Sequence, residues 1–199
     1  MANRISLFGC LAIAALSHGY CASADAAEMS INGSVLSIQG EIRPGDQYRF
    51  KDLLAGAAPS SVAYVDLVSG GGSIEAAAEI GRQIRAAGLT TVVDGSKERC
   101  ASSCGLIFLS GARRIYLNAG AASGVTGLQG FHGLGFHQGS DAITHNYSAD
   151  GTAQQIAVCH EFGSPQAAAL VAKASPVEIY GLSGETALAM GIATALTMK

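Results

Sequence analysis

Residues 62–93 constrain the fold more than any other part of the chain. The segment 62–68 is mostly apolar and rich in β-branched side chains, which is typical of a strand buried inside a sheet. A glycine-rich run at 69–73 follows it, and apolar residues then repeat at helical spacing as far as residue 87. A second apolar segment at 89–93 resembles the first. This order predicts two neighbouring parallel strands joined by a crossover helix.

The rest of the sequence continues this alternation. Further strands are predicted at 35–42 and 115–117, and helices at 50–57, 102–112, 152–172 and 184–190. Residues 119–151 are rich in Gly, Ala and Ser and predict a strand with loops. The helix at 102–112 is apolar on all sides, so we expect it to be buried. We expect a single α/β domain, residues 28–199, with repeated strand–helix units and a mostly parallel sheet.

Composition limits the classes of partner. Hydrophobic residues make up 49% of the 199 residues and charged residues only 14%, which fits a compact, well-buried body. The formal net charge is -3 and the pI is about 5.9, so the chain has no basic footprint for a nucleic acid. We therefore expect no nucleic-acid partner.

Residues 1–27 have the features of a signal peptide. A positive charge at Arg4 precedes an apolar run at 5–16, and small residues that suit cleavage follow at 22–27. The apolar run is too short to span a bilayer. We expect cleavage near Ala27 and export, most simply to a bacterial periplasm, with no stable membrane span in the mature protein.

Three cysteines lie outside the signal segment, namely Cys100, Cys104 and Cys159. In an oxidising compartment this odd number predicts one bridge with a free thiol, or none. Cys100 and Cys104 fall at a predicted helix start, where their Cβ vectors run side by side and suit a bridge poorly. A bridge from either to Cys159 is therefore favoured, and three buried free thiols remain the alternative.

A pair of serines, Ser102 and Ser103, stands at the start of the buried helix. Free backbone N–H groups and a positive field at this end can stabilise an oxyanion, and a hydroxyl there can act as a nucleophile. The alternative is that Ser102 or Ser103 only caps the helix. Likewise, the glycines at 70–72 suit either a close approach to substrate or a tight turn from strand to helix.

Several motifs resemble those of the ClpP-type peptidases of the ClpP/crotonase superfamily, in particular their exported relatives. Residues 69–74 (Ser-Gly-Gly-Gly-Ser-Ile) resemble the family's glycine turn, and 101–112 resemble its nucleophile helix. Gly-Phe-His at 130–132 resembles the segment that carries the catalytic base, and 183–192 resembles the end of the domain. The similarity spans roughly residues 35–194 and implies a ClpP/crotonase-like fold.

The resemblance also implies a catalytic site. Ser102 corresponds to the nucleophile and His132 to the base, while Gly72 and Ser103 correspond to the donors of the oxyanion hole. A second Gly-Phe-His keeps His137 as an alternative base. In the family, the interval between nucleophile and base is shorter than the one from Ser102 to His132.

The third member of the catalytic triad departs from the family pattern. Ile179 falls where the family has its aspartate, and an isoleucine has no charge to offer an imidazole. Glu178 is the adjacent candidate, out of register by one residue, and Asp141 is a weaker one. Without a carboxylate, the imidazole lacks an orienting partner and activity falls.

Other chemistries use neighbouring residues. A zinc site would draw on Cys100, Cys104, Cys159, His132 and His160. Cys159 and His160 are adjacent in sequence, however, which is an awkward geometry for two ligands of one metal. Cys104 as a nucleophile and Lys97 as the partner of Ser102 are further alternatives. We favour none of these and expect no metal or other cofactor.

The sequence thus predicts an exported serine hydrolase. It would cleave small peptides or unfolded proteins through an acyl-enzyme, without an ATPase partner. By analogy with the family, it would also form a homo-oligomer. The alternative is a non-catalytic ClpP/crotonase-like domain used for binding or assembly, which the isoleucine at 179 favours.

Overall fold

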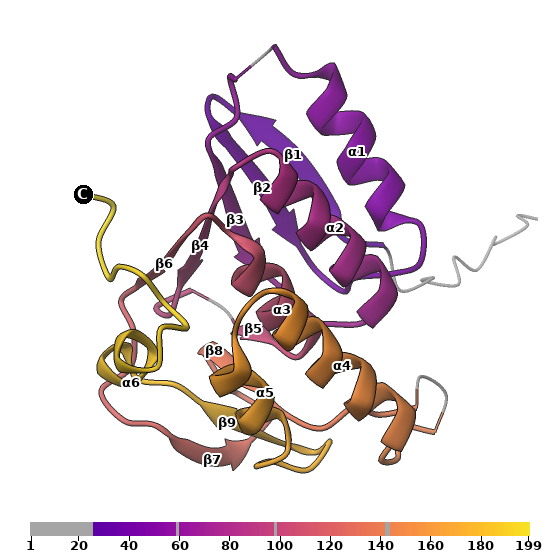
Figure 1. Ribbon diagram of the computed structural model, residues 1–199, viewed down its shortest axis with the longest axis vertical. Coiled ribbons are helices and arrows are strands. Elements are labelled where there is room, and N and C mark those ends of the chain that lie inside the picture. Colours follow the sequence, from indigo (N-terminus) through magenta and orange to yellow (C-terminus); the bar gives the residue numbers. More distant parts are fainter. Residues whose placement is uncertain (1–25, 59, 98, 142–143) are drawn as a thin grey trace, which may run out of the picture.

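The computed structural model describes residues 26–58, 60–97, 99–141 and 144–199 (Figure 1). Residues 1–25, which hold nearly all of the expected signal peptide, lie outside the described residues. Within the described ranges, no helix has the length and apolarity needed to cross a bilayer.

The larger sheet has 5 strands in the order β1-β2-β3-β4-β6. Its strands are β1 (Glu28–Asn32), β2 (Val35–Gln39), β3 (Tyr64–Val68), β4 (Thr90–Asp94) and β6 (Arg113–Leu117). The pairs β2–β3, β3–β4 and β4–β6 are parallel, as the alternation of strands and helices predicts. Strand β1 was not predicted. It pairs antiparallel with β2 across a tight turn at Gly33, whose φ of 59° suits glycine.

The smaller sheet has 4 strands in the order β5-β8-β9-β7. These strands are β5 (Arg99–Ala101), β8 (Gly133–Phe136), β9 (Glu178–Gly181) and β7 (Gly124–Gly127). Only β5 and β8 pair in parallel, whereas β8–β9 and β7–β9 are antiparallel. The expectation of a mostly parallel sheet was therefore wrong, because the chain returns through β9 between β8 and β7. The fold is mixed α/β.

Six helices are described, in the order α1 (Asp46–Gly56), α2 (Ile74–Ala86), α3 (Ser103–Ser110), α4 (Ala149–Glu161), α5 (Pro165–Val171) and α6 (Gly184–Ala189). Ser73 caps α2, since its Oγ accepts from the N–H of Ala76 at 3.2 Å. The helical region at 152–172 is two helices, with Pro165 opening the second.

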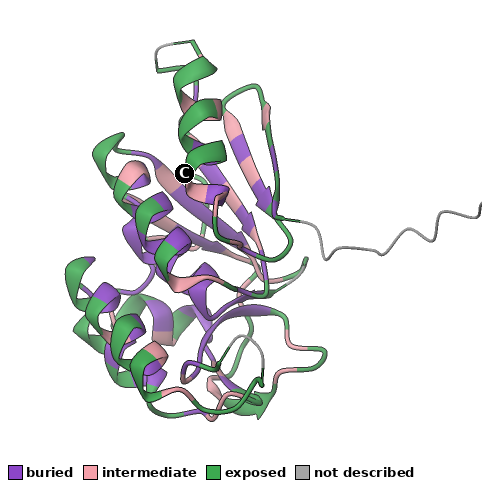
Figure 2. Ribbon diagram, turned by 90° about the vertical axis from the view of Figure 1, so that its right-hand side faces the viewer, coloured by how far each residue is buried: buried purple, intermediate pink, exposed green. Residues whose placement is uncertain are grey.

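Helix α3 forms the centre of the molecule. All of its residues are buried, as its uniformly apolar sequence predicts. It packs against α2 and lies where the two sheets meet, while α4 and α5 cover the smaller sheet (Figure 1). The outer helices expose one face and bury the other (Figure 2). An isolated parallel β-bridge between the backbones of Ser69 and Cys100 links the end of β3 to β5. Helix α3 therefore begins at the junction of the two sheets.

Ala27 belongs to the folded body. Its side chain is fully buried and its N–H donates to Oδ2 of Asp46 at 3.2 Å. Arg49 in turn donates from Nη1 to the carbonyl of Ala27 at 2.9 Å. Ala27 therefore contacts α1, and the end of the expected leader near this residue stays a prediction.

Candidate active site

Ser102 occupies a sharp turn between β5 and α3. Its φ of 56° and ψ of -124° are unusual for a residue with a side chain. Such backbone strain persists only where the surrounding structure holds it, and it is found at the strand-to-helix turn that presents a nucleophilic serine. The Ser102 side chain makes no cap hydrogen bond to α3. The alternative that Ser102 serves only as a helix cap is therefore wrong.

The glycine turn packs directly against Ser102. A Cβ on Gly71 would lie 2.7 Å from Cβ of Ser102 and 2.8 Å from the carbonyl oxygen of Ala101. Only glycine fits this position, which also has a φ of 100°. The turn is braced by Ser69, whose Oγ accepts from the N–H of Gly71 at 3.0 Å. The sequence analysis named Gly72 as a site residue and missed the contact that Gly71 makes with Ser102.

The orientation of the Gly72 amide follows from the hydrogen bonds of its two neighbours in the chain. The carbonyl of Gly71 accepts from the N–H of Ile42 at 2.8 Å, and the N–H of Ser73 donates to the carbonyl of Ile42 at 2.8 Å. Across a trans peptide, C=O and N–H point in opposite directions, and the described chain has no cis peptides. The N–H and C=O of Gly72 are therefore both directed away from Ile42.

Ser103 meets Gly72 on that side. The Ser103 Oγ donates to the carbonyl of Gly72 at 2.8 Å, which anchors the first residue of α3 to the glycine turn. The first N–H groups of a helix have no partner within the helix, so the Ser103 amide is available. Gly72, Ser102 and Ser103, which the sequence grouped as one site, thus lie together in the structure.

His137 lies at the same end of the parallel pair as Ser102. Strands β5 and β8 align Ala101 with Gly135, and the N–H of Ser102 donates to the carbonyl of Gly135 at 3.3 Å. His137 follows two residues later, level with the start of α3. Adjacent strands lie about 4.8 Å apart, so an imidazole there is close to the Ser102 turn.

His132 lies at the opposite end of β8. Gly133 aligns with Arg99, so His132 precedes the paired region, and its Nδ1 is 2.6 Å from the carbonyl oxygen of Lys97. With about 3.3 Å of rise per residue, the step from this level to Ser102 is about 13 Å along the strand. The pairing register therefore favours His137 over His132 as the neighbour of Ser102.

The environment of His137 suits a proton acceptor. Its Nδ1 is 2.7 Å from the carbonyl oxygen of Gln138. Because a carbonyl only accepts, Nδ1 carries the proton and the lone pair is on Nε2. The side chain is buried, and this desolvation lowers the pKa of His137. The imidazole is therefore neutral at neutral pH and can accept a proton.

Ile179 lies beside His137 on the neighbouring strand. The antiparallel pair β8–β9 aligns Phe136 with Tyr180, so the next residues along are His137 and Ile179. Residues directly opposite share a face, and Ile179 Cγ1 would be 2.6 Å from a Cβ on Gly135, on that same face. The position that the family resemblance reserves for an aspartate is thus next to the imidazole, and it is apolar.

Neither carboxylate suggested from the sequence takes that place. By strand alternation Glu178 points to the opposite face from Ile179, and its Oε2 accepts from Ser175 Oγ at 2.8 Å. Asp141 Oδ1 accepts from the N–H of Thr144 at 2.8 Å in an exposed turn. The carbonyl of Gln138 is instead the described partner of His137 Nδ1.

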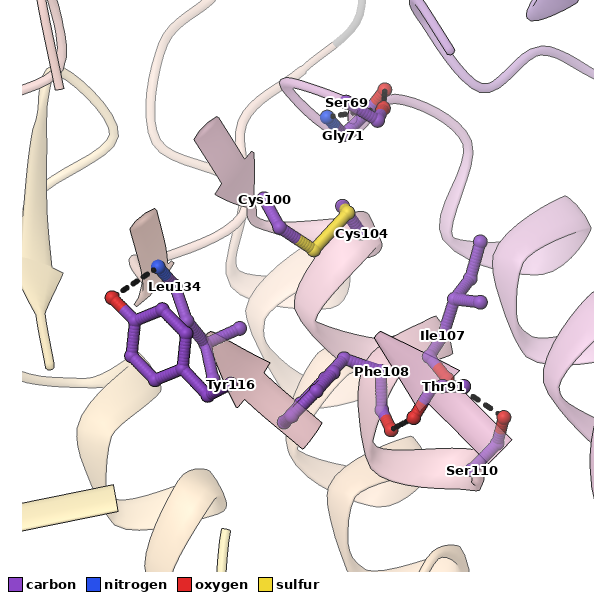
Figure 3. Close-up of a disulfide and its surroundings, with 10 residues drawn as sticks. All are labelled: Ser69, Gly71, Thr91, Cys100, Cys104, Ile107, Phe108, Ser110, Tyr116 and Leu134. Atoms are coloured by element: carbon purple, nitrogen blue, oxygen red, sulfur yellow. Dashed lines mark hydrogen bonds between the residues drawn. A yellow bond between two sulfur atoms is a disulfide. The ribbon is translucent and has the colours of Figure 1, made fainter. Parts of the chain in front are cut away.

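Cys100 and Cys104 form a disulfide (Figure 3). The sequence-based preference for a bridge to Cys159 was wrong, because Cys100 belongs to a strand and the chain turns sharply at Ser102 before Cys104. The two Cα atoms are then 5.1 Å apart, within bridging range. Cys159 is a buried free thiol, and burial raises its pKa to about 12.

The bridge also removes two alternative chemistries. Cys104 has no free thiol with which to attack, and a zinc cage would need the thiolates that the disulfide consumes. In the part of the chain that the structure describes, no group of three His, Cys, Asp or Glu residues is placed to hold a metal. Lys97 Nζ lies 3.5 Å from Asp66 Oδ2, at the start of β5 and away from Ser102.

An open cleft of about 660 Å³ runs along the glycine turn. Its lining includes the turn at 69–72 and the side chains of Arg99, Phe131, His132 and His145. Gly71 lines this cleft and also packs against Ser102, whereas Ser102 and His137 are not among the lining residues of the cleft. The sequence signals for the cleft were the glycine run and the Gly-Phe-His at 130–132. His145 reaches the cleft only through the fold.

Comparison with solved structures defines the class: the chain has a ClpP-like fold. It is similar to a ClpP1 mutant from Listeria monocytogenes, with a TM-score of 0.56 at 18% identity over 83% of this chain and 92% of that one. It is also similar to a mutant of the 1510-N membrane-bound stomatin-specific protease, with a TM-score of 0.52 at 16% identity over 82% and 78%. No family model and no curated protein matches the sequence.

Proposed function

We propose that the protein is a ClpP-like serine peptidase with Ser102 as its nucleophile. The observation that carries this proposal is the backbone of Ser102, a non-glycine residue at φ 56° whose hydroxyl caps nothing. A fold that maintains such a conformation at a helix start presents the oxygen for reaction. The fold similarity to two proteases supports peptide bonds as the substrate class.

In the proposed mechanism, Ser102 Oγ attacks the carbonyl carbon of a peptide and His137 Nε2 accepts its proton. The oxyanion that forms accepts hydrogen bonds from the N–H groups of Gly72 and Ser103. His137 then gives the proton to the leaving amine, and water hydrolyses the acyl-enzyme by the same route. The carbonyl of Gln138 fixes the tautomer of the imidazole.

Among the described residues, no carboxylate partners His137, and this implies a modest rate. A backbone carbonyl orients the ring, but it carries no full charge to stabilise the imidazolium that forms during the reaction. The proposal therefore describes a Ser–His dyad that is slower than a complete triad. Export to the periplasm, action without an ATPase and assembly into a homo-oligomer belong to the same proposal and rest on the sequence analysis.

A second candidate function is a binding or assembly domain without catalysis. The apolar Ile179 beside His137 favours it, because a buried isoleucine lowers the polarity of the position where catalysis needs charge. In that case peptides would occupy the cleft without being cleaved.

Covalent labelling separates the two functions. A fluorophosphonate probe reacts only with an activated serine, so we expect the purified protein to be labelled at Ser102. Ser102→Ala and His137→Ala should abolish or greatly reduce labelling, whereas His132→Ala, the matched histidine control, should retain it. A folded protein that resists the probe would exclude the hydrolase, and loss of labelling in His132→Ala alone would exclude His137 as the base.

A further inference from the structure

The disulfide encloses the proposed nucleophile. Cys100 is the central residue of β5 and Cys104 lies in the first turn of α3, so the bridge closes a ring through Ala101, Ser102 and Ser103. Both cysteines are fully buried. In Figure 3 the bridge joins the strand to the helix beside the turn that carries Ser69 and Gly71. The covalent link thus spans the turn that holds Ser102 at positive φ.

Helix α3 is held differently at its other end. Thr91 Oγ1 donates to the carbonyl of Phe108 at 2.7 Å, which ties the last turn of the helix to β4. In the described ranges, the hydrogen bonds that hold the first turn are the one from Ser103 Oγ to Gly72 and a longer one from the N–H of Ser102 to Gly135. The Ser102 side chain makes no cap hydrogen bond to α3. The disulfide is therefore the strongest restraint on the strained turn.

We propose that the Cys100–Cys104 disulfide positions Ser102 for catalysis, so that the protein is a hydrolase only in its oxidised form. This inference rests on the proposed function. A dithiol reductant supplies two electrons and two protons. The S–S bond breaks, Cys100 and Cys104 become thiols, and the reductant becomes a disulfide. The opened ring lets the backbone of Ser102 relax from its unfavourable φ and withdraws the hydroxyl from Gly72 and His137.

The disulfide-closed ring is short, so its effect on the position of Ser102 can be distinguished from its effect on the stability of the whole protein. A bridge across so few residues restrains the unfolded chain only a little, so its loss has a limited effect on global folding. It acts on the geometry of one turn. Reduction should therefore change the rate of the chemical step far more than the melting temperature. For a purely structural disulfide, the main effect of reduction would be on the melting temperature.

The experiment measures fluorophosphonate labelling of Ser102 against probe concentration, before and after reduction with dithiothreitol. A mass tag on free thiols verifies that the bridge is open, and mild denaturant with refolding is added if the buried sulfurs resist. We expect kinact to fall at least about tenfold while KI and the pH midpoint of labelling stay constant. Reoxidation should restore kinact.

Cysteine variants provide the matched control. The double variant Cys100→Ala/Cys104→Ala should behave like the reduced protein. Cys159→Ala removes a buried thiol outside the ring and should keep the wild-type rate together with its sensitivity to dithiothreitol. If the double variant does not fold, the reduction and reoxidation of the wild type decide. A reduced, folded protein labelled at the oxidised rate would overturn the inference alone, whereas an oxidised protein that is never labelled would overturn the proposed function with it.

Discussion

At the scale of single residues, the site depends on atoms that are directed by the backbone. Ser102 is held at φ 56°, and the Gly72 amide is turned away from Ile42 because Gly71 and Ser73 both bond to Ile42. His137 is set by its backbone as well, since the carbonyl of the next residue fixes the proton on Nδ1. Side chains supply the reactive atoms, and main-chain hydrogen bonds aim them.

His137 gives the site a predictable response to pH. Burial lowers its pKa below the ordinary 6.5, so the neutral base prevails above that pH. Labelling of Ser102 should rise with pH through a midpoint below 6.5 and then level off. The unfolded state binds the proton first as pH falls, so stability is full above 6.5 and decreases below it. A labelling profile with its midpoint above 6.5, or one unchanged in His137→Ala, would contradict this assignment.

At the scale of secondary structure, strand register decides which residues meet. Parallel pairing of β5 with β8 brings His137 to the level of the Ser102 turn and leaves His132 at the other end. Antiparallel pairing of β8 with β9 then sets Ile179 beside His137 and turns Glu178 to the opposite face. A shift of one residue would exchange Glu178 and Ile179, because neighbouring strand residues face opposite sides.

Ile179→Asp tests this register. A carboxylate opposite His137 can stabilise the imidazolium, so labelling per folded molecule should rise at least about tenfold. Replacing a fully buried isoleucine with a charged group should lower the free energy of unfolding by about 3–5 kcal/mol. Ile179→Asn is the control of equal shape without the charge. Equal labelling rates in the aspartate and asparagine variants would show that position 179 does not face the imidazole.

At the scale of the whole molecule, the two sheets meet at the start of α3. Three features lie at this junction: the β-bridge between Ser69 and Cys100, the Cys100–Cys104 disulfide and the glycine turn. Each sheet therefore contributes one side of the site. The N-terminal end of the described domain is secured separately. Asp46 is buried and accepts from the N–H groups of Ala27 and Arg43 and from Nη1 of Arg49.

Asp46→Ala should destabilise the domain. Its loss leaves the buried amide of Ala27 without a partner, which costs about 1–3 kcal/mol of unfolding free energy. Asp52→Ala, an exposed acid on the same helix, should change stability by no more than about 0.5 kcal/mol. Chemical denaturation measures both. Equal midpoints for the two variants would mean that Ala27 is not anchored in the folded state.

The predictable part of the molecule is local. Apolar periodicity was enough to find β3, α2 and β4. Strand β1 was missed because it directly follows the expected leader, in a segment for which the sequence analysis predicted no element. Strand β9 was missed because its four residues, Glu178–Gly181, are too few to show a period.

The sequence by itself determined the α/β class and the buried α3, because both follow from periodicity along the chain. The grouping of Gly72 with Ser102 and Ser103 came from the family resemblance, since Gly72 is distant from the two serines in sequence. Tertiary structure alone decided the mixed sheets, the Cys100–Cys104 bridge and the preference for His137. Strand direction and register depend on contacts between distant segments, and a single positive φ reversed the chain between the two cysteines. Local propensities carry no information about strand pairing or about this turn.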